Sequence, residues 1–415
     1  MGGFKMNTWY AGALKGAAVA FCLTGLLVCG QPVRAGEFSD MQQEFNSFKA
    51  DGGEFESYKA QIKQDYAAYK TIIQEEFATY RGDILKVWDK AEVSTKKTYV
   101  GYSPDYKVKK VVDYDKGVIR ISAVVPASEK EPAKVLEGHL KDLMTQNAQG
   151  AYKADQFTAG VEKKLKKKVD PSHLQEAEVG KKPIVGDMVT GKPRPTAKEI
   201  EAFLASMMGA ATTSTEKAPK QTHADVVTLE VKIPATGRAV KANAYLADVK
   251  RHAAKRGVDP ALVFAVMETE SAFNPMARSY VPAYGLMQIV PKSAGRDASK
   301  VVLGKDVVLS PSYLYNGGNN IAMGVAYLYI LNDRYLASVK NPKSRLYCVI
   351  AAYNTGAGNV ARAFIGSTNI KKAAKKINTM PPEKVYKVLI QKLPHKETRD
   401  YLQRVSKRMP TYQPV

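Results

Sequence analysis

Aromatic residues near the N-terminus repeat with a spacing of eleven. The first row is Phe55, Tyr66, Phe77 and Trp88, and the second is Tyr58, Tyr69 and Tyr80. Eleven residues make three helical turns at about 3.67 residues per turn, so both rows stay on one face of a helix. We therefore predict a long amphipathic helix that begins or breaks at Gly52-Gly53. Its aromatic face is expected to pack on the same chain, the alternatives being a partner helix or a membrane surface.

Downstream of this helix the pattern becomes typical of strands. Residues 98–102, 108–114 and 118–125 alternate between the two faces and are rich in β-branched and aromatic side chains. Asp115-Lys116-Gly117 has the composition of a tight turn. These segments predict a small sheet with a hairpin between its second and third strands.

The next region mixes helical and strand patterns. Residues 129–180 are polar with a helical pattern, whereas 183–189 and 226–233 have the character of strands. Small and polar residues dominate 210–222, which predicts a loop or linker. Strands are therefore expected to return after the helical region.

From about residue 245 the pattern is helical and remains so. Asp259 can cap the free amides of a helix start, and Pro260 suits the first turn. We predict a helix that runs through residues 261–267 and ends near Asn274-Pro275.

The positive charge of the chain belongs to its C-terminal part. The net charge is +22 over 415 residues; residues 238–415 hold 28 Lys and Arg against 10 Asp and Glu, whereas residues 36–237 hold 31 against 30. We expect an α+β fold, with a long helix and a small mixed sheet in residues 36–236 and a mainly α domain in residues 237–415. A positive field attracts a polyanion, which could be nucleic acid, an anionic membrane or a carboxylate-rich cell wall.

The first 35 residues have the pattern of an export signal. Lysines precede an apolar run from Ala17 to Val28, which is too short for a comfortable membrane span. We expect simple cleavage after Ala35, and hence a place in the periplasm or cell envelope. Leu26 to Cys29 has the form of a lipidation signal with Val28 in place of a small residue, so lipidation at Cys29 with outer-membrane attachment stays open, as does a retained anchor.

Cysteine and histidine usage predicts neither disulfides nor metal. Cys22 and Cys29 lie in the leader, so a cleaved chain keeps only Cys348, in an apolar run where a buried structural cysteine is expected. The five histidines are scattered without the spacing of metal ligands. We expect no metal and no cofactor.

Four short motifs follow one another in the C-terminal part. They are Glu270-Ser271-Ala272-Phe273-Asn274-Pro275, Gly285-Leu286-Met287-Gln288, Ala352-Tyr353-Asn354-Thr355-Gly356-Ala357-Gly358 and Glu397-Thr398-Arg399-Asp400-Tyr401. In order and spacing they resemble the soluble-lytic-transglycosylase domain, whose fold is similar to goose-type lysozyme. Upstream, residues 86–89, 99–103 and 112–119 resemble the N-terminal domain of membrane-bound lytic murein transglycosylase C.

The chemistry of glycosidic cleavage points to Glu270. A carboxylic acid with a raised pKa normally delivers the proton to the leaving oxygen, and Glu270 ends an apolar helix where it is desolvated. Glu268 is the rival, but two residues along a helix place it on the opposite side. The resemblance selects the Glu that directly precedes Ser, which is Glu270.

Most glycosidases need a second carboxylate, and the motifs between Glu270 and Glu397 contain none. The resemblance implies that the N-acetyl group of the substrate stabilises the sugar cation. It also implies that the same Glu then removes the proton from the C6 hydroxyl of N-acetylmuramic acid, so that a 1,6-anhydro ring closes.

The resemblance also implies substrate-binding positions at Ser279, Gln288, Tyr353, Asn354 and Glu397. Ser279 matches a serine near the acetamido group, Gln288 a substrate-binding residue, and Tyr353 a tyrosine near the reacting centre. Asn354 is more suited to holding its loop. An ordinary loop serine and a surface ion pair are the alternatives for Ser279 and Glu397.

We therefore expect a lytic transglycosylase that cleaves the β-1,4 bond between N-acetylmuramic acid and N-acetylglucosamine in peptidoglycan. The alternatives are a hydrolytic muramidase on the same fold and an inactive wall-binding module. Nucleic-acid binding rests on charge alone and conflicts with the export signal, so we expect no nucleic-acid partner.

Overall fold

A computed structural model describes residues 60–61, 64–279 and 282–413. Internal contacts divide the chain into residues 1–67 and 68–415, and the description below concerns the second unit. The leader with Cys29, and with it the proposed cleavage after Ala35, lies outside the described residues, as do Gly52-Gly53, Phe55 and Tyr58.

The sheet has five strands in the order β1-β2-β3-β6-β5. They are β1 (Thr98–Tyr102), β2 (Val108–Asp113), β3 (Val118–Pro126), β5 (Thr212–Lys217) and β6 (Ala224–Lys232). All neighbours pair antiparallel, whereas a mixed sheet was expected. Short connections explain the difference: Gly117, with a φ of 68°, turns β2 directly into β3. A parallel pairing occurs apart from this sheet, between β4 (Leu174–Gln175) and β7 (Val308–Leu309).

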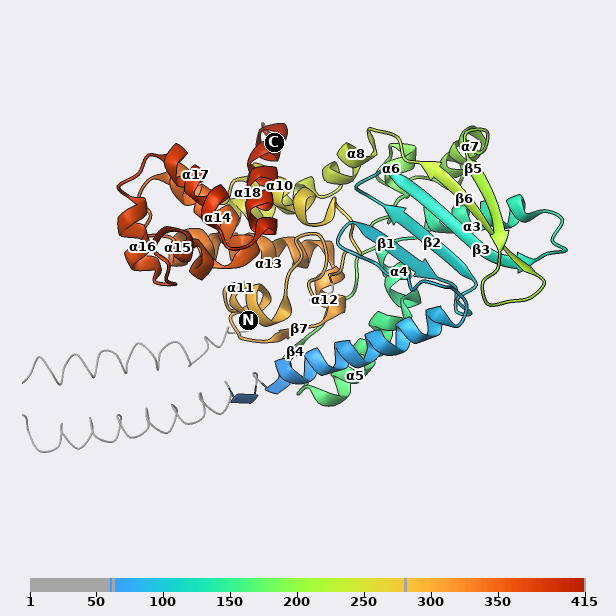
Figure 1. Cartoon of the computed structure of the whole chain (residues 1–415), viewed down its shortest axis with the longest axis horizontal. Helices are drawn as coiled ribbons and strands as arrows, with labels where there is room; N and C mark the ends of the chain where they lie inside the picture. Colours follow the sequence, from blue (N-terminus) through green and yellow to red (C-terminus); the bar gives the residue numbers. More distant parts are fainter. Residues whose placement is uncertain (1–59, 62–63, 280–281, 414–415) are drawn as a thin grey trace, which may run out of the picture. The chain divides into compact units, whose positions relative to one another are not determined.

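Helix α3 (Pro132–Thr145) packs on strands β2, β3 and β6, and α7 (Ala197–Met208) packs on α3 (Figure 1). The helical pattern of residues 129–180 corresponds to α3, α4 (Ala148–Ala154) and α5 (Gln156–Lys168). Along the chain these helices lie between β3 and β5.

Two local predictions are wrong. Residues 183–189 were expected to form a strand, but Gly186–Thr190 form the short helix α6, because a short buried apolar run has the same pattern in either structure. The expected loop at 210–222 contains β5. All six residues of β5 are exposed, so it lacks apolar alternation, and its backbone pairing with β6 defines it.

The C-terminal part is helical, as expected. Its helices are α8 (Gly237–Asn243), α9 (Leu246–Arg256), α10 (Pro260–Ser271), α11 (Arg296–Val302), α12 (Pro311–Tyr315), α13 (Gly317–Ile330), α14 (Pro342–Thr355), α15 (Ala357–Ile365), α16 (Ile370–Ile377), α17 (Pro382–Lys392) and α18 (Lys396–Arg408). The α+β fold class is thereby confirmed. The domain boundary at residue 237 stays a prediction, since residues 68–415 form one compact unit.

The aromatic face of the predicted N-terminal helix packs within this unit. The helix ends at residue 85, and its last part, drawn in blue in Figure 1, runs beside α5. Tyr80 is buried, with its ring about 6 Å from those of Tyr102, Tyr106 and Phe157. Trp88 Nε1 donates a hydrogen bond of 2.7 Å to the carbonyl of Tyr106. For the described residues these contacts favour packing on the same chain over a partner or membrane role.

A fully buried ion pair joins α6 to α8. Lys241 Nζ lies 3.0 Å from Asp187 Oδ1, and both side chains are inaccessible to solvent. The ammonium also donates to the carbonyls of Ile184 and Pro183. Burial lowers the pKa of Lys241, and the charge of Asp187 opposes this shift. The pair therefore links a helix of the N-terminal part to the first helix of the C-terminal part.

No helix within the described residues combines the length and apolar character needed to cross a membrane.

Candidate active site

Helix α10 carries both candidate catalytic carboxyl groups. Asp259 caps its start, with its side chain accepting the Ala261 amide at 2.8 Å, and Pro260 occupies the first turn as predicted. All residues from Ala261 to Ser271 are buried. The helix is thus a central core element, packed against α9 and α18.

Glu268 is engaged in structural contacts. Its carboxylate lies 3.3 Å from Arg238 Nη1 and 3.2 Å from Arg408 Nε, and it accepts a hydrogen bond of 3.0 Å from the hydroxyl of Tyr412. These three contacts engage the Glu268 carboxylate within the protein, which suits a structural role better than reaction with a substrate.

Glu270 faces a hollow of about 330 Å³ on the other side of α10. Its side chain is only 6% exposed, and Oε2 lies 3.6 Å from Lys96 Nζ. Burial raises the pKa of Glu270, whereas the nearby ammonium of Lys96 works in the opposite direction. A carboxyl group that holds its proton and still faces an open hollow can act as a general acid.

Two tyrosines lie beside Glu270: Tyr401 is buried and Tyr353 is half-buried. Burial first, and then the charge of Glu270, raises the pKa of both Tyr353 and Tyr401. The hydroxyl of Tyr353 donates a hydrogen bond of 2.9 Å to the carbonyl of Met287. Tyr353, a predicted site residue, therefore connects α14 to the turn that contains Gln288.

The turn at residues 285–288 is tightly built. Gly285 has a φ of 73°, and a Cβ at this position would lie 2.5 Å from the carbonyl oxygen of Leu314. Asn320 fastens the turn by accepting the Met287 amide at 2.8 Å. Gln288 has a φ of 49°, donates through Nε2 to Gly285, and keeps a buried Oε1 that makes no hydrogen bond within the protein. At position 285, glycine is therefore required both for space and for the positive φ.

The remaining predicted residues lie on three different elements. Ser279 Oγ accepts the Ala283 amide at 3.2 Å and so closes a loop. Asn354 Oδ1 accepts the hydroxyl of Thr398 at 2.7 Å, which fits the expected role in holding its motif. Glu397 has a 67% exposed side chain and pairs with Lys96 at 3.4 Å. Glu270 and Glu397 line the hollow, whereas Ser279, Gln288, Tyr353 and Asn354 do not.

Sequence reasoning missed several residues that line this hollow. They are Thr95, Lys96, Lys97, Thr269, Tyr401 and Arg404. Tyr401 belongs to the fourth motif, so its position could have been noted. Lys96 precedes β1 in a segment with no recognisable pattern, and only the fold brings it to Glu270.

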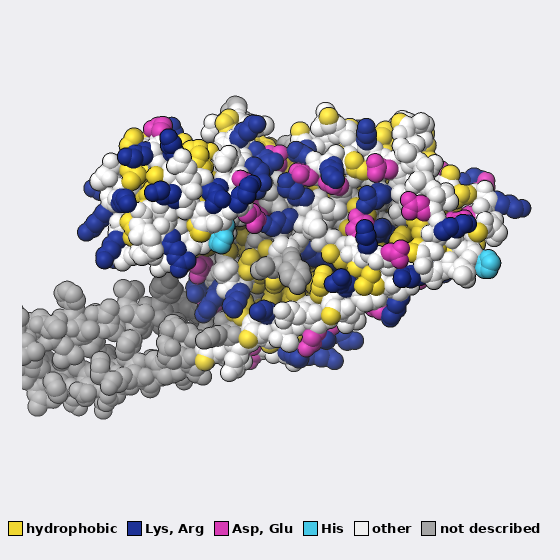
Figure 2. All heavy atoms as spheres, in the orientation of Figure 1, with side chains coloured by type: hydrophobic (Ala, Val, Ile, Leu, Met, Phe, Trp, Pro, Cys, Tyr) yellow, Lys and Arg dark blue, Asp and Glu magenta, His cyan; other side chains and the backbone are white. Residues whose placement is uncertain are grey.

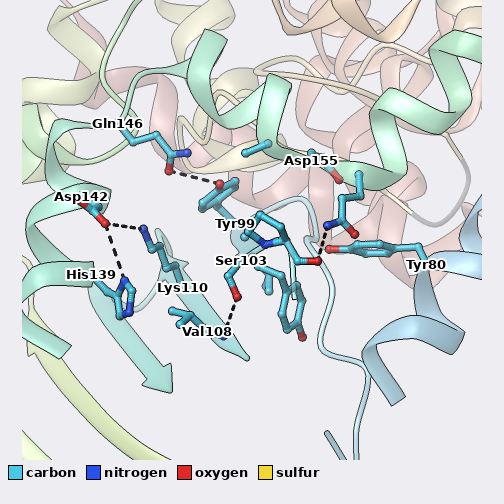
Figure 3. Close-up of a pocket in the computed structure, with 15 residues that line it drawn as sticks. Tyr80, Tyr99, Ser103, Val108, Lys110, His139, Asp142, Gln146 and Asp155 are labelled. Atoms are coloured by element: carbon cyan, nitrogen blue, oxygen red, sulfur yellow. Dashed lines mark hydrogen bonds and ion pairs between the residues drawn. The ribbon is translucent and has the colours of Figure 1, made fainter. Parts of the chain in front are cut away.

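A second hollow of about 290 Å³ lies at β1 and β2, beside α3, α4 and α5. Figure 3 shows Tyr80 and Tyr99 in its wall, with the hydroxyl of Tyr99 donating to Gln146 Oε1 at 3.5 Å. Lys110 Nζ lies 3.6 Å from Asp142 Oδ2, so their charges balance. None of the predicted site residues lines this hollow.

Cys348 is buried and unpaired, as expected. Within the described ranges, no group of three or more His, Cys, Asp and Glu side chains could hold a metal ion.

Comparison with known families identifies both parts of the chain. Residues 248–377 match the Transglycosylase SLT domain, and residues 62–171 match the N-terminal domain of membrane-bound lytic murein transglycosylase C. The first match contains three of the four motifs, and Glu397 lies beyond its end.

Several relatives align with most of the chain. The membrane-bound lytic murein transglycosylase C of Mannheimia succiniciproducens is 33% identical over 335 residues, which are 80% of this chain and 86% of the relative. The membrane-bound lytic murein transglycosylase C of Actinobacillus succinogenes is 31% identical over 338 residues, which are 80% of this chain and 87% of the relative. A solved structure of an inactive variant of the lytic transglycosylase Slt from Pseudomonas aeruginosa aligns at 28% identity, with a TM-score of 0.31, over 40% of this chain and 23% of that chain. Since relatives match along most of their own length, the chain belongs to the lytic murein transglycosylase family, as a relative of membrane-bound lytic murein transglycosylase C.

Proposed function

We propose that Glu270 performs both proton transfers of the lytic transglycosylase reaction in this chain. As a member of its family the chain is a lytic transglycosylase, a lyase that acts on peptidoglycan. The bond expected to break is the β-1,4 bond between N-acetylmuramic acid and N-acetylglucosamine.

The proposed reaction balances without water. The Glu270 carboxylic acid gives its proton to the glycosidic oxygen as the bond from C1 to that oxygen breaks, and the substrate N-acetyl group stabilises the sugar cation. The Glu270 carboxylate then takes the proton of the C6 hydroxyl while O6 bonds to C1. The glycan ends in a 1,6-anhydro ring, and Glu270 is protonated again.

The observation that carries this assignment is the contrast between the two carboxyl groups of α10. Glu270 is buried beside a hollow with its pKa raised, while Glu268 is held by two arginines. Glu397, the other carboxylate that lines the hollow, is largely exposed and paired with Lys96. This arrangement favours a mechanism with one carboxylate over one that needs a buried nucleophile.

The remaining site residues support Glu270 in this proposal. Tyr353 and Gln288 are proposed to act in sugar binding, although neither lines the hollow itself. Asn354 is proposed to hold the α14 motif, and Ser279 the loop that follows α10. Glu397 is proposed to bind substrate at the exposed edge of the hollow.

Product masses test the reaction type directly. Digestion of purified peptidoglycan should give muropeptides with 1,6-anhydro ends, each lighter by one water than the hydrolysed product. Reducing N-acetylmuramic acid ends as the main product would mean a hydrolytic muramidase. Intact peptidoglycan after prolonged incubation would instead indicate a wall-binding module.

The relatives are named membrane-bound, which is in keeping with a place in the cell envelope. We further propose export to the periplasm, by cleavage after Ala35 or, with outer-membrane attachment, by lipidation at Cys29. Mass analysis of the mature N-terminus would distinguish these routes.

Charge is expected to strengthen the association with the wall. Figure 2 shows Lys and Arg side chains spread over the C-terminal helices with few acidic ones among them. Lys371, Lys372 and Lys375 of α16 are exposed. Binding of the mature chain to insoluble peptidoglycan should therefore weaken steeply as salt rises toward about 0.5 M, where screening acts within a few ångströms.

Matched triple substitutions sharpen this salt experiment. Replacing the three α16 lysines with Gln should lower both the binding and its salt dependence. Replacing Lys163, Lys167 and Lys168 of α5, also exposed, removes the same charge from the nearly neutral part and should change binding less. Salt-independent sedimentation of the unmodified protein with peptidoglycan would disprove the electrostatic account.

A further inference from the structure

We infer that Lys96, from the segment that precedes β1, is a positioning residue of the active site that sets the acid strength of Glu270. This inference rests on the proposed role of Glu270 as proton donor. It gives the N-terminal part of the chain a direct role in the chemistry of the C-terminal part.

The backbone around Lys96 is fixed by a tight turn. Thr95 Oγ1 accepts the amides of Lys97 at 3.3 Å and Thr98 at 3.1 Å, and the Thr95 amide donates to the Thr98 carbonyl at 2.8 Å. The turn leads directly into β1, so the sheet determines where it lies.

The same turn is fastened to the loop that follows α10. The amide of Arg278 donates to the Thr95 carbonyl at 3.3 Å, and Asn274 Nδ2 donates to the Lys96 carbonyl at 3.4 Å. Arg278 is itself buried and pairs with Asp155 at 2.8 Å. The position of the Lys96 ammonium beside Glu270 is thus built from both parts of the chain.

Lys96 is the only cationic side chain within 4 Å of the Glu270 carboxyl in the described part of the chain. It is shared between Glu270 and Glu397, at 3.6 and 3.4 Å. The neighbouring Lys97 also lines the hollow, but its ammonium pairs with Asp115 at 2.8 Å. Of these two adjacent lysines, Lys96 contacts the Glu270 carboxyl group and Lys97 pairs with Asp115 instead.

Other titratable and charged groups surround Glu270 from two helices. They are Tyr353 of α14 and Glu397, Tyr401 and Arg404 of α18. Glu397 raises the pKa of Glu270 by repulsion, and Lys96 lowers it. The effect of Lys96 on the pKa of Glu270 is therefore opposite to the effects of burial and of Glu397.

This opposition matters because Glu270 must both give and accept a proton. Burial alone would keep the proton on Glu270 and make it a weak acid. A nearby ammonium stabilises the carboxylate that forms as the proton moves to the glycosidic oxygen. Without Lys96 that carboxylate would form beside Glu397, the other acidic residue among the described residues that line the hollow.

The test is the pH dependence of turnover in the full mature chain, at constant ionic strength. In Lys96→Met, kcat at the optimum should fall about tenfold, with KM little changed. Because the protonated form of Glu270 starts the reaction, activity is lost as pH rises through its pKa, and this alkaline limb should move up by about one pH unit. Lys96→Arg should restore the wild-type limb, and Lys97→Met should leave it in place.

Two results would overturn the inference. The first is an unchanged alkaline limb in a folded Lys96→Met protein, with folding checked by its thermal midpoint. The second is a rise in KM alone, which would make Lys96 a substrate contact. The result for Glu270→Gln is read separately: if that variant stays active, the proposed function of Glu270 fails whatever Lys96 does.

Discussion

Glu270→Gln is expected to keep its fold and lose activity by a factor on the order of 10³ or more, because the proposed mechanism assigns both proton transfers to this one carboxyl group. Gln has nearly the same shape but cannot exchange a proton. The measurement is the initial rate of release of anhydro-muropeptides from purified peptidoglycan, compared at equal thermal midpoints.

Glu268→Gln is the matched control on the same helix. This variant keeps the helix and the side-chain volume but weakens the contacts with Arg238 and Arg408. It should lower stability while leaving turnover within about tenfold of wild type. Equal losses of activity in the two variants, or loss in Glu268→Gln alone, would show that the assignment of Glu270 is wrong.

Lys241→Met is expected to lower the free energy of unfolding by about 3–5 kcal/mol, because it leaves Asp187 buried and without its ion-pair partner. Methionine fills much of the lysine volume, so the loss is chiefly electrostatic. Urea denaturation monitored by circular dichroism would measure it. The effect should be larger than that of removing an exposed pair such as Lys343 with Glu383.

The double variant Asp187→Leu, Lys241→Met tests the reason for this loss. With both charges removed, no uncompensated charge stays in the core, and the double variant should be more stable than Lys241→Met alone. Recovery will be partial, since the carbonyls of Pro183 and Ile184 lose a donor. A Lys241→Met protein within about 1 kcal/mol of wild type would mean that water or rearrangement satisfies Asp187.

The parts of the fold that local chemistry dictates were predictable. Asp259-Pro260 identified the start of α10, and three strand patterns identified β1, β2 and β3 within about one residue, because capping and alternation act between near neighbours. The strand β5 has no such signal, since it exists only through its pairing with β6. The α6 run was wrongly predicted as a strand, because a short buried apolar run has the same pattern in a helix and in a strand.

Some residues of the candidate site could likewise be recognised from local sequence motifs, and others could not. Glu270 and Tyr353 belong to motifs whose order could be recognised. Tyr401 belongs to the fourth motif, but the sequence did not indicate a role for it. Lys96 could not be found, because its closeness to Glu270 depends on how the turn before β1 meets the loop after α10. The sequence of residues 95–97 alone does not predict these contacts with the loop after α10.

The hydrogen bonds that hold Thr95 and Lys96 to the loop after α10 limit how the two parts of the chain can be separated or exchanged. A fragment that lacked the residues before β1 would lose the ammonium that lies beside Glu270, the proposed proton donor. A chimera carrying a foreign N-terminal module would need a cation at the same turn, whatever else that module contributed. Recombination between relatives is then constrained to exchange the two modules together, or to keep the junction before the first strand intact.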